Sequence, residues 1–242
     1  MSGGSITEDE VMSATDNLIT STIVRGAGAA LIALAIAGIG EARSAPIAPV
    51  KTEAPSGRYT LDKAHASLTF RVNHIGFSNY TAQFKRFDAK LELDTKDPAL
   101  SKVTATIDPR SLDLDAPPAG FLDTLLGAKW LNVVTFPTMS FRSTKIELTA
   151  PSKARIHGEL TLHGVKQPVT LDATFNGGYA GHPYDPNARI GFSARGSFKR
   201  SAFGVAEGLP PPGTTMGVGD TVEVIIEAEF NGPPLKQKSA NK

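Results

Sequence analysis

Residues 160–171, "LTLHGVKQPVTL", are the stretch that decides the fold, because two alternating runs flank a central His163-Gly164 pair. Leucine or valine recurs at every second position on both sides of the pair, and this is the period of a half-buried β-strand. The pattern predicts a hairpin in which His163 lies on the polar face. The apolar face would be formed by Leu160, Leu162, Val169 and Leu171.

The same period governs most of residues 57–230, where we count eight or nine such runs separated by Gly, Pro, Asn and Asp turns. Strands with a single apolar face must bury it, either on a second sheet or by closing the sheet on itself. We therefore predict an all-β domain that forms a closed or nearly closed antiparallel barrel of eight strands. The clearest alternating runs are at 67–74, 87–94, 103–107 and 221–230.

The residues expected to point into this barrel differ widely in size. An eight-stranded barrel encloses room for packed side chains or for one small ligand. Small inward residues leave space, so a ligand cavity and a packed interior are both compatible with the sequence. The expected inward set combines large Phe70, Phe84, Phe141 and Phe192 with small Ala89, Ala105, Ala194, Gly196 and Ala228.

One segment, residues 117–132, breaks the period of two and predicts a short amphipathic helix. Asp123 near its start and Lys129 near its end suit the helix dipole, while Gly127 weakens the helix from inside. The apolar face of this helix would carry Leu122, Leu125, Leu126 and Trp130.

The N-terminal region has the layout of a secretory signal. Residues 26–40 are an uncharged apolar run preceded by Arg25, and Ala42 and Ser44 are small residues at the positions that a signal peptidase reads. The run is shorter than the roughly 20 apolar residues of a membrane span. We expect residues 1–44 to be a signal peptide of an exported, periplasmic protein, with an uncleaved anchor as the alternative.

The remaining boundaries follow from composition. Residues 45–56 are rich in Pro and Ala and predict an extended linker, residues 57–231 the barrel domain, and residues 232–242 a disordered tail. The glycine-rich stretch at 208–220 lacks the lysine and helix of a phosphate-binding loop and predicts a long loop at a barrel mouth.

Charge and cysteine content exclude several classes of function. The chain has 242 residues, a net charge of +1 and no cysteine, so disulfides, thiolate metal sites and a cysteine nucleophile are excluded. The sequence has no concentrated basic face of the kind that binds nucleic acid. Loss of residues 1–44 would remove two basic and five acidic residues and give a net charge of +4, which favours transient contact with an anionic membrane surface. A monomer and a dimer are both compatible with the sequence.

Four segments in order carry a resemblance to a known family. The chain resembles the YceI-like family of exported, lipocalin-like barrels associated with polyisoprenoid binding. The resemblance implies a barrel that binds an apolar chain and has neither catalytic residues nor a cofactor. The segments are "YTLDKAHASLTFRVNHIGFS" (59–78), "GELTLHGVKQPVTL" (158–171), "GFSARGSFKRSAFGV" (191–205) and "VGDTVEVIIEAEF" (218–230).

The expected ligand is a polyisoprenoid, an isoprenoid quinone or a similar lipid. In the helix segment this family commonly carries an Arg and a His where the present chain has Leu122 and Leu125, which favours a more apolar ligand. Arg200 follows an alternating strand and would either meet a phosphate or carbonyl oxygen at the cavity rim or keep a strand edge soluble. The candidate ligand-binding residues are Leu68, Phe70, Val72, His74, Phe84, Phe141, Phe192, Phe198, Arg200 and Phe203.

The histidines give no metal site and two candidates for chemistry. His157, Glu159 and His163 share one strand face, but His157 and His163 would lie about 20 Å apart, too far to share one zinc ion. We therefore expect them to be solvated outward side chains. His65 and His74, beside the first strand, would hydrogen-bond a ligand oxygen, act as a general base, or bind a neighbouring loop carbonyl.

Two alternatives to a binding protein remain open from the sequence. One is a structural or stress-related envelope protein whose barrel is packed and holds no ligand. The other is a barrel hydrolase that uses His65 or His74. The sequence contains no G-x-S-x-G elbow, no H-E-x-x-H and no P-loop, and we expect a protein that is not an enzyme.

Overall fold

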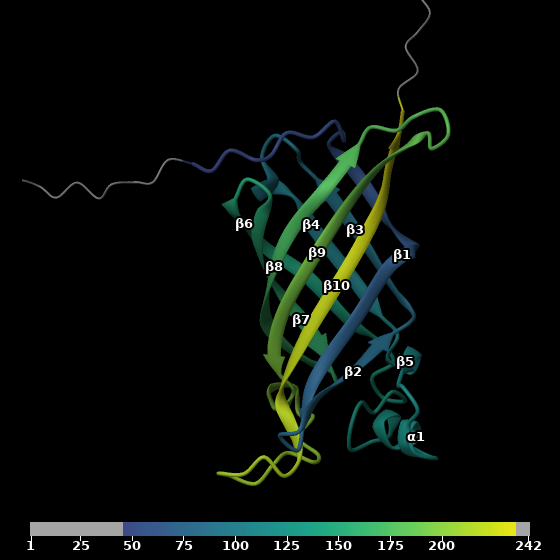
Figure 1. Ribbon diagram of the computed structural model, residues 1–242, viewed down its shortest axis with the longest axis vertical. Helices are drawn as coiled ribbons and strands as arrows, with labels where there is room; N and C mark the ends of the chain where they lie inside the picture. The colour runs from purple at the N-terminus through teal and green to yellow at the C-terminus, as the bar shows by residue number, and fades with distance from the viewer. Residues whose placement is uncertain (1–45, 236–242) are drawn as a thin grey trace, which may run out of the picture. The chain divides into compact units, whose positions relative to one another are not determined.

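The computed structural model describes residues 46–235, so the predicted signal or anchor segment and the last seven residues lie outside the described part. Ten strands, one α-helix and three short 3-10 helices occupy this range (Figure 1). The strands are β1 (Gly57–His74), β2 (Ser78–Phe84), β3 (Phe87–Leu93), β4 (Lys102–Ile107), β5 (Leu112–Asp113), β6 (Met139–Ala150), β7 (Lys153–Leu162), β8 (Val165–Tyr179), β9 (Asn187–Lys199) and β10 (Val218–Pro234). The helices are α1 (Phe121–Leu126), η1 (Pro98–Leu100), η2 (Pro109–Ser111) and η3 (Arg200–Phe203).

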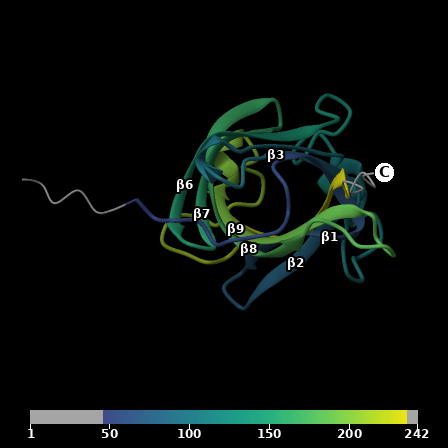
Figure 2. The same ribbon diagram turned by 90° about the horizontal axis from the view of Figure 1, so that it is seen from above.

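Eight of the strands close into an antiparallel barrel. Their order is β10-β9-β8-β7-β6-β4-β3-β1, and pairing of β1 with β10 closes the ring, which Figure 2 shows from above. The C-terminal part of β1, from Thr69 to His74, pairs with β2, and β2 pairs with the short β5. The predicted eight-stranded barrel with a single short helix is confirmed for the described residues.

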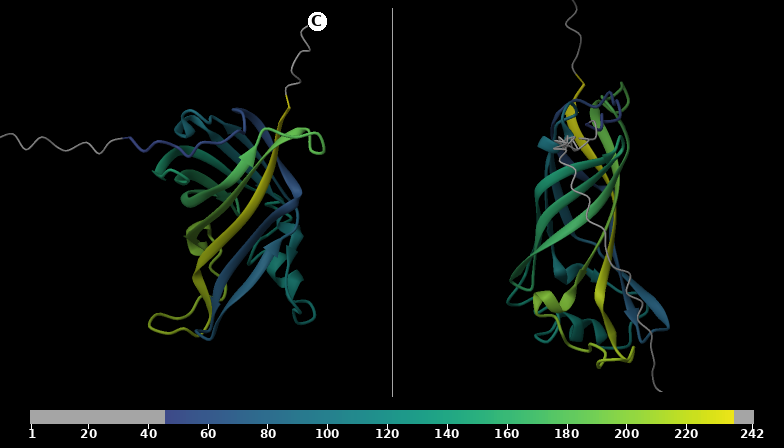
Figure 3. Two further views of the ribbon diagram at one scale, coloured as in Figure 1. Left: turned by 45° about the horizontal axis from the view of Figure 1, so that its top comes forward. Right: turned by 90° about the vertical axis from the view of Figure 1, so that its left-hand side faces the viewer.

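The two ends of the barrel are distinguished by their turns. We call the end with the β6–β7 turn and the start of β1 the upper end, and the end with the β1–β2 and β7–β8 turns the lower end. Helix α1 and the long loop before β10 both lie at the lower end (Figure 3). The predicted loop at 208–220 therefore ends at Gly217, because β10 begins at the next residue.

The β7–β8 hairpin has the predicted register but a different role for His163. Leu162 pairs with Val165 around a two-residue turn, and His163 and Gly164 both have positive φ (52° and 75°), as a type I′ turn requires. His163 Nδ1 lies 3.2 Å from the carbonyl oxygen of Phe203, and the His163 ring packs edge-on against the ring of Phe136. The expectation of a solvated His163 was wrong, because the turn points the imidazole into neighbouring loops.

The apolar segment at 117–132 forms a shorter helix than its leucine pattern spans. Helix α1 ends at Leu126, and Gly127 N–H donates to the carbonyl of Thr124 in the last turn. Trp130 therefore lies beyond the helix. The C-terminal strand is longer than predicted. Strand β10 continues through Gly232 to Pro234, where a disordered tail was expected.

Gly158 in β7 provides the space in which the ring of Phe141 lies. A Cβ atom on Gly158 would be 2.3 Å from Cζ of Phe141 and 2.6 Å from the carbonyl oxygen of Arg142. We expect Gly158→Ala to lower the free energy of unfolding by about 1–3 kcal/mol, because the ring and the backbone must both move. Urea denaturation measures this loss.

The matched control for that prediction is Gly191→Ala in β9. The nearest heavy atom to a Cβ at Gly191 is 3.9 Å away, an ordinary van der Waals distance. Equal losses of stability in the two variants would contradict the argument, because they would reflect only the replacement of a glycine in a strand.

Candidate functional site

The barrel encloses a cavity of about 810 Å³ that extends along its interior from the lower to the upper end. This volume lies within the range of roughly 300–1,000 Å³ that is usual for small-molecule sites. Tyr80 and Trp130 line the cavity at the lower end, and Asp94 and Lys153 line it at the upper end. Between these ends, aliphatic and aromatic side chains form the wall, so the interior is hollow and apolar.

Four of the five small inward residues predicted from the sequence account for this space, and Gly196 is the one that does not line the cavity. Ala89, Ala105, Ala194 and Ala228 all line the cavity, each from a different strand. An alanine leaves room that a larger residue on the same face of the strand would fill. The four leucines and valines of the β7–β8 hairpin also line the cavity, which confirms their predicted inward direction.

Nine of the ten candidate ligand-binding residues line the cavity. The exception is Phe203, which is 1% exposed and packs edge-on against Phe198, with the ring centroids 5.2 Å apart. Phe203 lies in η3, after the end of β9. Its ring therefore packs among buried apolar side chains near the lower end and does not line the cavity. The nine that line the cavity are Leu68, Phe70, Val72, His74, Phe84, Phe141, Phe192, Phe198 and Arg200.

Arg200 has a structural role that neither sequence interpretation foresaw. It is 5% exposed, and its guanidinium group donates four hydrogen bonds of 2.8–3.0 Å to backbone carbonyls. An arginine has five N–H donors, so one remains for any ligand. The guanidinium also lies 5.1 Å from the ring centroid of Trp130. The four acceptors belong to Val205, Glu207, Val218 and Gly219.

This arrangement corrects the expectation of a surface charge at a strand edge, because the side chain is buried. Arg200 lines the cavity, and its contact with a ligand oxygen there stays a prediction. The side chain ties the two ends of the lower loop, residues 205–217, to each other beneath the cavity. Burial lowers the pKa of the Arg200 guanidinium below its ordinary value, and the nearby Asp220 opposes this shift.

The two candidate histidines of β1 lie in different places. His74 is exposed and lines the cavity at the lower end. His65 does not line it, and its Nδ1 lies 3.0 Å from Oδ2 of Asp62. A general base needs a partner that orients it. Among residues 46–235, His74 has no side-chain hydrogen bond of this kind, and His65 has one but away from the cavity.

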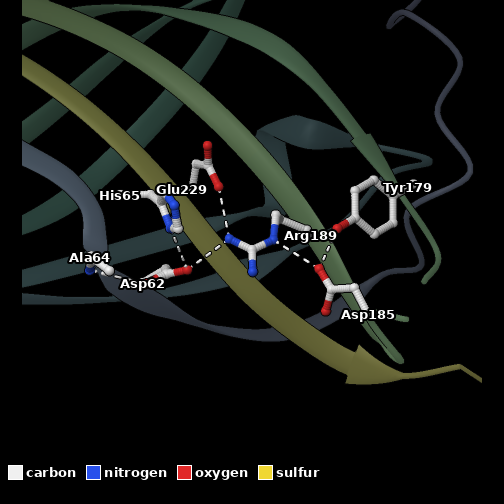
Figure 4. A network of polar contacts seen from close by, with 7 residues as sticks. All are labelled: Asp62, Ala64, His65, Tyr179, Asp185, Arg189 and Glu229. Atoms are coloured by element: carbon white, nitrogen blue, oxygen red, sulfur yellow. Dashed lines mark hydrogen bonds and ion pairs between the residues drawn. The ribbon is translucent and has the colours of Figure 1, made fainter. Parts of the chain in front are cut away.

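Asp62 and His65 belong to a network of charged groups that does not line the cavity (Figure 4). Three extra residues in β1 between Leu61 and Ala66 form a bulge opposite β10 and place both side chains there. Arg189 Nη1 donates to Asp62 at 2.7 Å and to Glu229 at 2.8 Å. The hydrogen bonds from His65 and Arg189 lower the pKa of Asp62 to about 2.

The same network contains the one group of metal-ligand atoms found among the described residues. The ligand atoms of Asp62, His65 and Glu229 lie within 4.8 Å of one another. Arg189 already provides positive charge between the two carboxylates, at hydrogen-bond distance from both. The arrangement is that of an ion-pair network which fastens the β1 bulge to β9 and β10.

Part of the cavity wall comes from residues that the sequence assigned to a linker. Residues 46–56, which we call the strap, contact the barrel, whereas the sequence predicted only an extended linker at 45–56. Pro49, Val50 and Thr52 line the cavity. The Pro- and Ala-rich composition gave no indication of these contacts, because none of the three residues belongs to an alternating pattern.

Comparisons with known proteins identify relatives across most of the chain. A family model described as YceI-like domain matches residues 59–230. Protein YceI of Salmonella arizonae is 36% identical over 180 residues, which cover 73% of this chain and 87% of that protein. Among solved structures, Burkholderia cenocepacia BcnA has a TM-score of 0.60 at 25% identity, covering 70% of this chain and 98% of BcnA.

A second solved structure shares the fold at lower identity. It is a polyisoprenoid binding domain from Saccharophagus degradans implicated in plant cell wall breakdown, with a TM-score of 0.50 and 13% identity. The match covers 72% of this chain and 98% of that domain.

Within residues 46–235, no helix is long and apolar enough to cross a membrane.

Proposed function

The chain belongs to the YceI-like family, and from this membership and the hollow barrel we propose that it is an exported binding protein for a long-chain apolar ligand. The single observation that carries the proposal is the apolar cavity of about 810 Å³ inside the barrel. A packed structural barrel would need no such space, because protein interiors are otherwise close-packed.

Burial of an apolar chain supplies the driving force for binding from water. Each CH₂ group moved out of water contributes about 0.8 kcal/mol, so a few prenyl units suffice for tight binding. When the ligand comes from a membrane this gain largely cancels, because lipid tails are equally apolar. Selection then depends on the length of the cavity and on the few polar groups at its ends, such as His74 and Tyr80 below and Asp94 above.

The proposed ligand class is a polyisoprenoid, an isoprenoid quinone or a similar lipid. The barrel from Saccharophagus degradans that is described as polyisoprenoid binding supports the choice, because it shows that such a ligand is compatible with this fold. Leu125, at a helix position where this family commonly has a polar residue, lines the cavity. An apolar side chain there supports a ligand with a weakly polar head group.

Export and membrane contact are parts of the same proposal. The apolar run at 26–40 followed by Ala42 and Ser44 supports cleavage of a signal and a periplasmic location. The expected net charge of +4 after cleavage supports transient contact with anionic lipid, where an apolar ligand would be collected or delivered.

Native mass spectrometry of the protein purified from its export compartment tests this function. We expect a mass increment that corresponds to one lipid per barrel, and organic extraction should release a prenyl species in equal molar amount. Extracted protein should regain an increment after incubation with a prenyl alcohol or a prenyl quinone. An unchanged apo mass before and after that incubation would overturn the proposal and favour a structural envelope protein.

A further inference from the structure

A segment that precedes the matched family domain crosses the upper end of the cavity. The family match begins at residue 59, and the strap occupies residues 46–56. Figure 2 shows the strap running across the ring of strands. The strap contacts the β6–β7 turn and then β8 before it continues into β1. It therefore passes over the upper mouth of the cavity and forms part of the cavity wall there.

The C-terminal end of the strap is firmly anchored. Ala54 is 3% exposed and packs in a cluster of buried apolar side chains that includes Tyr59. Tyr59 Oη donates to the carbonyl oxygen of Pro55 at 2.7 Å, and Ser56 Oγ accepts a hydrogen bond from the backbone N–H of Thr95 at 2.9 Å. Burial raises the pKa of Tyr59 to about 12, as expected of a phenol held inside the core.

The N-terminal part of the strap, residues 46–52, is held much more weakly. Two hydrogen bonds join it to the barrel, from Val50 N–H to the carbonyl of Pro151 at 2.8 Å and from Thr52 Oγ1 to the carbonyl of Gly178 at 3.4 Å. Val50 is 40% exposed, so little of its surface is buried against the barrel. Segments with few buried contacts and exposed hydrogen bonds open locally at low free-energy cost.

We propose that residues 46–52 form a gate that swings about the anchored residues 54–56 and controls ligand entry and release at the upper end. This inference rests on the proposed function, because a gate needs a ligand to admit. Breaking two hydrogen bonds moves the three cavity-lining strap residues away from the mouth and leaves every strand pairing intact. The closed position adds Pro49, Val50 and Thr52 to the wall around a bound chain.

A reversible disulfide tests the gate. The chain has no cysteine, so Val50→Cys with Pro151→Cys introduces one pair and no competing thiol. Their hydrogen-bonded backbones suit the Cα separation of about 4.4–6.8 Å that a disulfide needs. The probe is dansyl-labelled geranylgeraniol, displaced by excess unlabelled geranylgeraniol in a stopped-flow experiment. We expect oxidation to slow dissociation at least tenfold and dithiothreitol to restore the original rate.

Two further variants make the test specific. Thr104→Cys with Arg142→Cys crosslinks the outward faces of β4 and β6, and its oxidation should leave the dissociation rate unchanged. Thr52→Ala removes the hydrogen bond that Oγ1 donates to the carbonyl of Gly178 and the one that it accepts from Ala54 N–H, and it should speed dissociation at least threefold, without any crosslink.

The outcomes separate the gate from the function on which it rests. Equal rates for the oxidised and reduced strap variant, with the crosslink verified by mass, would overturn the gate and leave binding intact. Equal slowing by the β4–β6 crosslink would also overturn it, because stiffening of the barrel would then explain both. Failure of the reduced protein to bind the probe would overturn the proposed prenyl binding and the gate together.

Discussion

Replacing Arg200 by lysine is expected to lower the free energy of unfolding by about 3–5 kcal/mol, because buried carbonyls lose donors and each unsatisfied acceptor costs roughly 1–3 kcal/mol. A lysine has three donors on one atom and lacks the planar fork that reaches carbonyls in several directions. It also lacks the flat face that lies over Trp130. For a domain of this size the melting temperature should fall by about 10 °C.

The measurement uses the protein's own reporter. Trp130 is the single tryptophan, so its fluorescence follows the environment beside residue 200 directly during urea denaturation. Arg195→Lys in β9, the strand that precedes Arg200, is the matched control, because Arg195 is exposed and its replacement should change stability by less than about 0.5 kcal/mol. Similar losses for the two variants would contradict the role of Arg200 as an anchor of the lower loop.

Filling the cavity at Ala105 should abolish ligand binding with little effect on the fold. Ala105 lies in β4 between Ala89 of β3 and Phe141 of β6, and all three residues line the cavity. A phenylalanine there would occupy the path of the ligand chain. We expect Ala105→Phe to weaken the binding of dansyl-labelled geranylgeraniol at least 100-fold, equivalent to about 2.7 kcal/mol. Fluorescence titration measures the change.

The neighbouring residue provides the control for this variant. Thr104 is exposed on the other face of the same strand, so Thr104→Phe adds the same ring outside the barrel and should leave the dissociation constant within about twofold. Circular dichroism and thermal unfolding establish that both variants are folded. Unchanged binding by Ala105→Phe would place the ligand outside the barrel.

The barrel and most of its lining could be predicted because strand periodicity is local information. The inward position of Leu160 or Ala105 depends only on whether its neighbours two residues away share its face. Closure of the sheet followed from the need to bury that face. The same reasoning overestimated α1, because the leucine pattern continues to Trp130 whereas Gly127 ends the helix.

The misassigned residues depend on contacts that the local alternation of the sequence does not record. A cation after a strand has the same local sequence whether it points to solvent or to carbonyls, and the carbonyls that bind Arg200 lie 5 to 19 residues away. The strap binds Pro151 and Gly178, about 100 residues or more further along the chain. The amino-acid composition of such a segment indicates an extended linker, but it does not indicate which surface the segment contacts.

The pairing of β1 with β10 has a consequence for the order in which the protein assembles. It joins residues such as Ser67 and Glu227, so the ring cannot close before nearly the whole chain is available. Contacts of such long sequence separation slow folding, because the entropy of the intervening loop is lost before they form. A chain that emerges N-terminus first would keep β1 without its closing partner until the end of synthesis. Completion of the last strand is therefore the event that commits the chain to its final topology.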